Sequence, residues 1–172
     1  MHTHTLKFVT WNVNGLGHKI KRGLINRAIN RHKAEVIFLQ ETHLIDKQQE
    51  SMGRGRYKVV SYAHFSSGSR GVMILVRKAI PFHIIKTWGD KNGCYTAVQG
   101  EWEGETMILL NIYAPPGLQL KVLEEIGKIL VEMPNALTII GGDLNLVWKT
   151  DIDRTSIKIE STATQGKLEN FA

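Results

Sequence analysis

The 172-residue sequence has a single cysteine, Cys94, and no long apolar run. One cysteine excludes an intramolecular disulfide bond and a metal site built from several thiolates, and it fits a reducing compartment. The longest stretch without a charged residue, 106–120, contains Pro115-Pro116. It is too short and too broken for a membrane span, which needs about 20 apolar residues. The first residues also lack the pattern of a signal peptide. We therefore expect an intracellular protein with no membrane contact.

Several catalytic patterns are absent as well. The sequence contains no Ser-His-Asp pattern, no His-Glu-x-x-His, no phosphate-binding glycine loop and no Cys-x-x-Cys. Nothing in it indicates an obligate protein partner. The groups left for chemistry are carboxylates, amides and phenols.

Acidic residues are scarce at the N-terminal end. Residues 1–35 hold seven of the 22 basic residues but one of the 16 acidic residues, so the whole net charge of +6 arises there. Most of these cations fall in 19–33, among them Lys19, Lys21, Arg22 and Arg27. Such a basic segment favours a polyanionic partner, although a solvated helix face would explain it equally well.

Apolar patterning predicts one α/β domain over residues 1–172. Strands are predicted at 6–13, 35–40, 57–63, 71–77, 82–88, 95–102, 106–113 and 136–140, and helices at 19–32 and 118–130. The first strand, helix and strand predict a right-handed crossover in a layered fold. The strands in the middle of the chain form a meander, which predicts antiparallel pairing.

Uncommon polar residues stand where these strands end. They are Asn12, Asn14, Glu41, Asn111, Tyr113, Asp143 and Asn145. Ligands gather at strand ends in layered α/β folds, because the loops vary there while the sheet stays rigid. The pattern therefore predicts one convergent polar site.

The residue types in this site indicate phosphodiester hydrolysis. Carboxylate and amide oxygens suit Mg²⁺ or Mn²⁺, and Glu41 with one neighbouring amide or carboxylate would suffice as protein ligands. Asp143 could orient or deprotonate a water molecule, while Asn12 and Asn145 donate to phosphate oxygens. Tyr113 could donate to the charge that develops on phosphorus.

Each of these residues also has a structural interpretation. Asn14-Gly15 alone is a turn signal, Glu41 could be an acid at a helix start, and residues 142–145 could form an Asx turn. His43 and His64 fit surface or supporting positions better than metal ligation. The functional interpretation depends on the joint occurrence of the polar residues at strand ends.

The chain resembles the exonuclease/endonuclease/phosphatase superfamily through four ordered motifs. They are TWNVNGL (residues 10–16), LQETH (39–43), NIYAP (111–115) and GGDLN (141–145). Within the superfamily it looks most like the apurinic-type endonuclease domain of LINE-type retrotransposons. That likeness includes SRGVMIL (69–75) and Asp153-Arg154.

The resemblance implies a layered α/β sandwich of two mixed β-sheets flanked by helices. It implies that Glu41 is the principal metal ligand and that Tyr113 contacts phosphate. It assigns Asp143 to the attacking water, with Asn145 as its orienting partner. Asn12 would contact phosphate and the family's catalytic histidine.

Other assignments follow from the same resemblance. Asn14 stands where repair members carry an aspartate, and we group it with Glu41 as a metal ligand. Asn111 and the basic residues Lys19, Lys21, Arg22 and Arg27 are the expected nucleic-acid contacts. Family members use Mg²⁺ to nick DNA and leave a 3′-hydroxyl that, in retrotransposons, primes reverse transcription. We therefore expect DNA as the partner and a nuclear location.

The sequence departs from the family in one respect. Its last histidine is His83, and it contains no Ser-Asp-His motif. We therefore expect a domain incomplete at its C-terminus, with weak or no nuclease activity. Two alternatives remain: a repair nuclease of the apurinic/apyrimidinic or exonuclease III kind, which Asn14 and His43 disfavour, and a non-catalytic remnant that binds nucleic acid.

Overall fold

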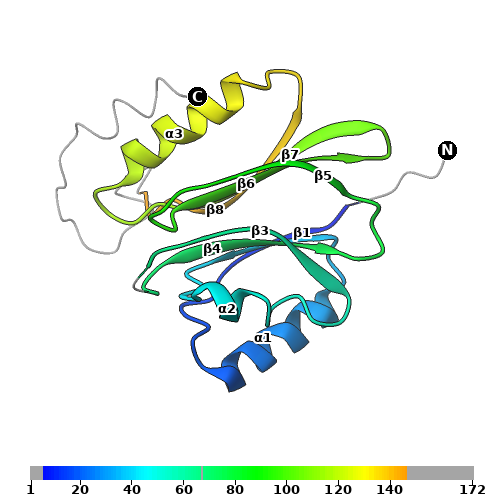
Figure 1. Ribbon diagram of the computed structural model, residues 1–172, viewed down its shortest axis with the longest axis vertical. Helices are drawn as coiled ribbons and strands as arrows, with labels where there is room; N and C mark the ends of the chain where they lie inside the picture. Colours follow the sequence, from blue (N-terminus) through cyan, green and yellow to red (C-terminus); the bar gives the residue numbers. More distant parts are fainter. Residues whose placement is uncertain (1–5, 67, 147–172) are drawn as a thin grey trace, which may run out of the picture.

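Two four-stranded β-sheets lie face to face, and helices cover their outer surfaces (Figure 1). The computed structural model describes residues 6–66 and 68–146. The first sheet has the order β1-β2-β4-β3 and the second β5-β6-β7-β8. The strands are β1 (Phe8–Asn12), β2 (Val36–Gln40), β3 (Tyr57–His64), β4 (Gly71–Arg77), β5 (His83–Gly89), β6 (Tyr95–Trp102), β7 (Glu105–Tyr113) and β8 (Leu137–Asp143). The helices are α1 (Lys19–His32), α2 (Asp46–Gln49) and α3 (Gln119–Val131).

Both sheets are mixed. β1 and β2 are parallel and joined through α1, and β7 and β8 are parallel and joined through α3. All other strand pairs are antiparallel. The predicted layered α/β sandwich of two mixed sheets is therefore confirmed. The short helix α2 was not predicted.

The core of the sandwich follows from alternation along the strands. Every residue of β2 is buried, because its two faces contact different apolar layers. Ile37 and Leu39 pack with residues of α1, whereas Val36 and Phe38 pack between the sheets. Alternate residues of a strand point to opposite faces, so one short apolar run serves both layers.

β8 lies at the outer edge of the second sheet among the described residues. Its side chains Leu137 and Ile140 are 57% and 54% exposed. At Gly141, by contrast, an added Cβ would lie 2.5 Å from the Phe38 ring, so the two sheets approach closely there. Asp153-Arg154 and the predicted C-terminal incompleteness lie outside the described residues.

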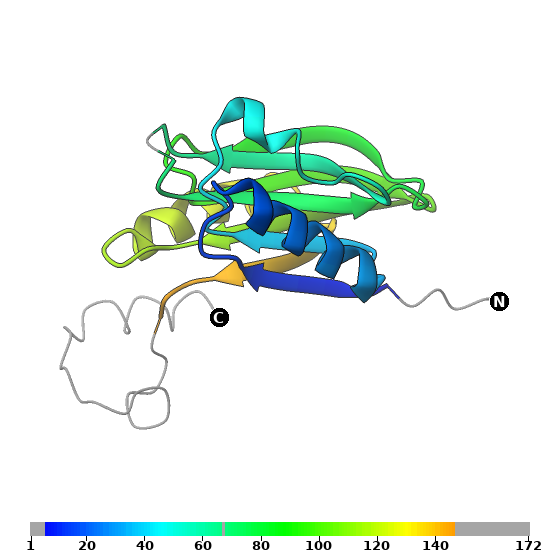
Figure 2. The ribbon, with the colours of Figure 1, turned by 90° about the horizontal axis from the view of Figure 1, so that it is seen from below.

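The carboxyl ends of four strands meet at one edge of the sandwich. Asn12 is level with Gln40 in the first sheet, and Tyr113 is level with Asp143 in the second. Figure 2 shows β1 (blue) beside β8 (orange), so the parallel pairs of the two sheets end close together. No helix in the described part of the chain is long and apolar enough to cross a membrane.

Candidate active site

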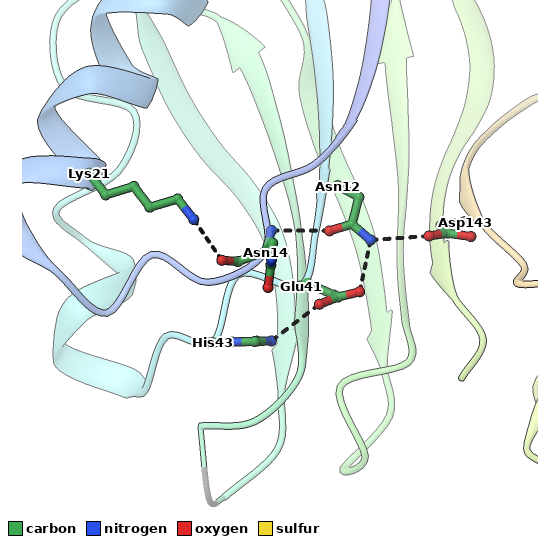
Figure 3. Close-up of polar contacts among 6 residues, drawn as sticks. All are labelled: Asn12, Asn14, Lys21, Glu41, His43 and Asp143. Carbon is green, nitrogen blue, oxygen red and sulfur yellow. Dashed lines mark hydrogen bonds and ion pairs between the residues drawn. The ribbon is translucent and has the colours of Figure 1, made fainter. Parts of the chain in front are cut away.

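Asn12 joins two carboxylates that come from different sheets. Its side-chain Nδ2 donates to Glu41 Oε1 at 2.8 Å and to Asp143 Oδ2 at 3.1 Å (Figure 3). Asn12 ends β1, Glu41 follows β2 and Asp143 ends β8. The structure therefore brings these three predicted site residues together, although 131 positions separate Asn12 from Asp143.

Main-chain hydrogen bonds hold the first two loops together. The Gly15 N–H donates to the Glu41 carbonyl at 2.6 Å, and the Leu16 N–H donates to the Thr42 carbonyl at 2.7 Å. These bonds continue the pairing of β1 with β2 beyond the strand ends. The main chain of Glu41 is thereby fixed relative to Asn12.

The backbone near the carboxylates adopts left-handed conformations. Asn14, Glu41, His43 and Asn145 have φ angles of 45°, 52°, 53° and 48°. They are four of the six non-glycine residues with positive φ among those described. Such conformations are unfavourable for side chains other than Asn, Asp and Gly, and they persist where the surrounding structure enforces them.

The same local turn occurs on both sides of the site. Asn12 Oδ1 accepts the N–H of Asn14 at 3.0 Å, and Asp143 Oδ1 accepts the N–H of Asn145 at 3.0 Å. The Asx turn considered as a structural alternative for residues 142–145 is thus present. It coexists with a place in the site, because the other oxygen of Asp143 still reaches Asn12.

Negative charge gathers around Tyr113 and Glu41. Burial, followed by the nearby charge of Glu41 and a hydrogen bond to it, raises the pKa of Tyr113 to about 12. The charge of Asp143 adds to this effect. The phenol therefore keeps its proton at neutral pH and can donate a hydrogen bond.

His43 is a site residue to which sequence reasoning gave no active role. Its Nε2 lies 3.6 Å from Glu41 Oε2 (Figure 3). The surface or supporting position expected from the sequence is compatible with this contact. The available signal was its place in the LQETH motif, two residues after Glu41.

The profile of the Endonuclease/Exonuclease/phosphatase family matches residues 9–158. This chain belongs to that family. The match includes all the candidate site residues at the four strand ends.

Solved structures share the fold of this family member. A humanized D. rerio TDP2 with 14 mutations is 19% identical, has a TM-score of 0.62, and the match covers 83% of this chain and 67% of that chain. AP endonuclease LMAP from Leishmania major is 20% identical, with a TM-score of 0.67 and coverages of 89% and 59%. D. rerio TDP2 in complex with a single-strand DNA product is 18% identical, with a TM-score of 0.60 and coverages of 86% and 63%. This chain thus spans about two thirds or less of their lengths, and the likeness shows a common fold.

The expectation that Asn111 contacts nucleic acid does not fit the structure of this family member. The residue is fully buried between the sheets. Its Nδ2 donates to the main-chain carbonyls of Leu39 at 2.8 Å and Met73 at 2.9 Å, and its Oδ1 accepts from Gln40 at 2.7 Å. No side-chain hydrogen is left to donate to a phosphate. Asn111 instead ties β7 to β2 and β4 directly beneath the site.

Two of the four basic residues of α1 that were expected to contact nucleic acid hold the loop that carries Asn14. Lys21 Nζ donates to the Asn14 carbonyl at 2.6 Å. Arg22 Nη1 donates to the carbonyls of Leu16 and Gly17 at 2.8 and 2.6 Å. Lys19 and Arg27 are exposed. The structure thus separates cations engaged by the protein from cations that face solvent.

The site fits Mg²⁺ or Mn²⁺ by the chemistry of its donors. Within residues 6–66 and 68–146 there is no group of three or more His, Cys, Asp or Glu side chains suited to a metal. Mg²⁺ needs no such group, since one or two carboxylates with water and substrate phosphate usually hold it. The half-buried Glu41 carboxylate, with oxygen-bearing neighbours, meets this requirement.

Proposed function

We propose that this chain is a metal-dependent DNA-nicking endonuclease domain of the retrotransposon type. The observation that carries the proposal is the Asn12 amide, which holds Glu41 and Asp143 at one edge of the sandwich. A pair of carboxylates from different sheets, beside a protonated phenol, can serve phosphodiester hydrolysis.

The side chains divide the work by their chemistry. Glu41, with Asn14 beside it, would hold Mg²⁺ or Mn²⁺, which when bound neutralises charge on the phosphate. Asp143 orients the attacking water and accepts its proton. The Tyr113 phenol, which is hydrogen-bonded to Glu41 and protonated at neutral pH, would donate its hydrogen to a phosphate oxygen in place of Glu41. Asn145 offers its second amide hydrogen to the same phosphate, the first being donated to the Ala114 carbonyl. Asn12 would have to exchange Glu41 or Asp143 for the phosphate, because both of its amide hydrogens are donated to these carboxylates.

Support for the retrotransposon type comes from the motifs. An amide at Asn14 and the LQETH sequence resemble LINE-type endonucleases more than repair enzymes. DNA is the proposed substrate, with the exposed Lys19 and Arg27 as candidate phosphate contacts, and a nuclear location follows from this role. The chain contains no Ser-Asp-His motif, so we expect nicking by the 172-residue chain to be slow.

Nicking of supercoiled plasmid in Mg²⁺ tests the proposal. Glu41→Gln and Asp143→Asn should each lower the rate by about 10²–10³-fold, because each removes charge from the reacting centre. Lys78→Gln is the matched control, since Lys78 is exposed and follows β4 at the opposite edge of the sheets. Circular dichroism should show the same fold for all variants. Equal rates for Glu41→Gln and the parent would overturn the proposal.

Two comparisons separate the alternatives. A repair nuclease would cleave an oligonucleotide with an abasic site much faster than the intact duplex, whereas we expect no such preference. A non-catalytic remnant would bind DNA in a strongly salt-dependent manner without any Mg²⁺-dependent nicking. If the parent nicks DNA and Glu41→Gln abolishes this activity, the interpretation as a non-catalytic remnant is excluded.

A further inference from the structure

Arg70 is a cation near the carboxylates that takes part in no ion pair among the residues described. The ion pairs in that part of the chain involve other basic residues, such as Arg77 with Glu35. Arg70 is half-buried. A half-buried guanidinium without a carboxylate partner is unusual, because burial of a charge is costly unless an opposite charge compensates it.

The main chain places Arg70 next to the candidate active site. The following residue, Gly71, accepts the N–H of Thr42 through its carbonyl at 3.0 Å, and Thr42 directly follows Glu41. Arg70 Nη1 lies 3.8 Å from the Cys94 Sγ, and the Cys94 carbonyl accepts the Tyr113 N–H at 2.6 Å. The guanidinium is therefore close to the loop that contains Glu41 and to the main chain that pairs with Tyr113.

Aromatic stacking orients the guanidinium. Its central carbon lies 4.6 Å from the centroid of the Phe65 ring. Phe65 is itself fixed by a β-bridge to Asn92. Stacking of this kind holds the planar group while its edge remains available for a bidentate contact.

Open space borders Phe65. A pocket of about 790 Å³ runs between β3 and β5, and Phe65, His64 and Lys91 are among the residues that line it. These strands end at the same edge of the sandwich as Glu41 and Asp143. A polymer bound at the carboxylates thus has room to continue past Arg70.

We propose that Arg70 binds a phosphate of the nucleic-acid strand held at the active site. This inference rests on the proposed function and adds a substrate contact to it. Glu41 and Asp143 both repel an anionic strand, and a fixed cation beside them offsets this repulsion in addition to any metal held by Glu41. The guanidinium fork matches two phosphate oxygens, which a compact ammonium group does not. No carboxylate within residues 6–66 and 68–146 pairs with this charge, and the phosphate would supply that partner.

Binding of a short fluorescein-labelled DNA duplex, followed by anisotropy over about 50–200 mM salt, tests the proposal. The full chain is compared with Arg70→Gln, Arg70→Lys and the control Lys78→Gln. Arg70→Gln should weaken binding about tenfold through loss of a charge-assisted hydrogen bond. It should also reduce the slope of log affinity against log salt by about 0.9. Arg70→Lys should keep the slope and lose part of the affinity, and Lys78→Gln should resemble the parent.

The outcomes separate this inference from the proposed function. If the parent binds DNA and Arg70→Gln equals Lys78→Gln in affinity and slope, the role of Arg70 is wrong and the proposed function stands. If the parent binds no DNA, both are wrong. If Arg70→Gln melts at a lower temperature than the parent, the salt dependence of DNA binding by Arg70→Lys decides whether Arg70 contacts a phosphate. A slope like that of the parent then supports the phosphate contact, and a reduced slope overturns it.

Discussion

The units β1–α1–β2 and β7–α3–β8 have the same plan but differ in how they are stabilised. Each is a parallel strand pair whose connecting helix covers one sheet. β2 is buried along its whole length, whereas β8 exposes Leu137 and Ile140. The helices differ too: α1 is basic and buries Ile25 and Ile29, while α3 is more apolar.

The two units also hold their carboxylates differently. In the first unit, Gly15 and the side chains of Lys21 and Arg22 fix the loops around Glu41. In the second unit, the Asp143 carbonyl accepts the Ala114 N–H at 2.9 Å, and Asn145 Nδ2 donates to the Ala114 carbonyl at 3.3 Å. One half of the site is therefore fixed by many polar contacts in the loops. The other half has fewer such contacts and depends more on how closely β8 approaches its neighbours.

The largest expected effect comes from breaking the link between the units. Asn111→Leu should lower the free energy of unfolding by about 3 kcal/mol, because it removes three hydrogen bonds in a dry interior, two to main-chain carbonyls and one from the Gln40 amide. Urea denaturation of the full chain measures this. The exposed Asn135→Leu serves as control and should change stability by less than about 0.5 kcal/mol. Equal losses for the two variants would contradict the role of Asn111.

A pair of glycine substitutions contrasts the two units directly. In Gly142→Ala the new Cβ would lie 2.3 Å from the Ile112 carbonyl oxygen, so β7 and β8 must shift. We expect a loss of about 2 kcal/mol from this overpacking. Gly23→Ala on α1 meets nothing within 4 Å and should stabilise the protein by about 0.5–1 kcal/mol through helix propensity. The melting temperature should therefore fall for Gly142→Ala and rise for Gly23→Ala.

A smaller effect separates the two kinds of cation on α1. Arg22→Gln removes two hydrogen bonds to loop carbonyls and should cost about 1 kcal/mol of stability. Arg27→Gln should leave stability unchanged because the side chain is exposed. Denaturation curves for the two variants check this. A larger loss of stability for Arg27→Gln than for Arg22→Gln would refute the distinction between cations that hold the loop and cations that face solvent.

The smallest effect concerns alkaline pH and Tyr113. Below pH 10 the phenol is protonated in both the folded and unfolded states, so the stability that it contributes does not change with pH. Between pH 10 and about 12 the unfolded state loses the proton first, so the stability that this phenol contributes declines. Tyr113→Phe should remove that part of the decline. The free energy of unfolding is measured against pH for both the parent and the variant. Only the difference between the two curves reports Tyr113, since burial also raises the pKa of Tyr57 and Tyr95.

The strands and the place of the site could be predicted from the sequence. Apolar runs marked β2 and β8, and the polar residues after them marked the edge where Glu41 and Asp143 meet. Such predictions succeed because burial patterns are local and parallel strands end at the same edge of a sheet. The family of the chain was predicted through the four motifs and is confirmed.

The environment of each amide could not be predicted in the same way. Asn111 and Asn12 are chemically equivalent, yet one is sealed between the sheets and the other faces two carboxylates. Alternation along β7 puts Asn111 on the same face as the buried Leu109, which was an available signal. Its partners Leu39 and Met73 are far away in the sequence, so only the folded chain shows that its donors are taken.

The left-handed backbone at Glu41 and His43 has a consequence for laboratory evolution. Glycine would relieve about 1 kcal/mol of strain at either position, because it has no Cβ. A library screened for thermal tolerance alone should therefore enrich glycine at codons 41 and 43. A library screened for DNA cleavage should retain glutamate at codon 41. Sequencing both selected pools would show which residues the fold prefers and which the chemistry requires.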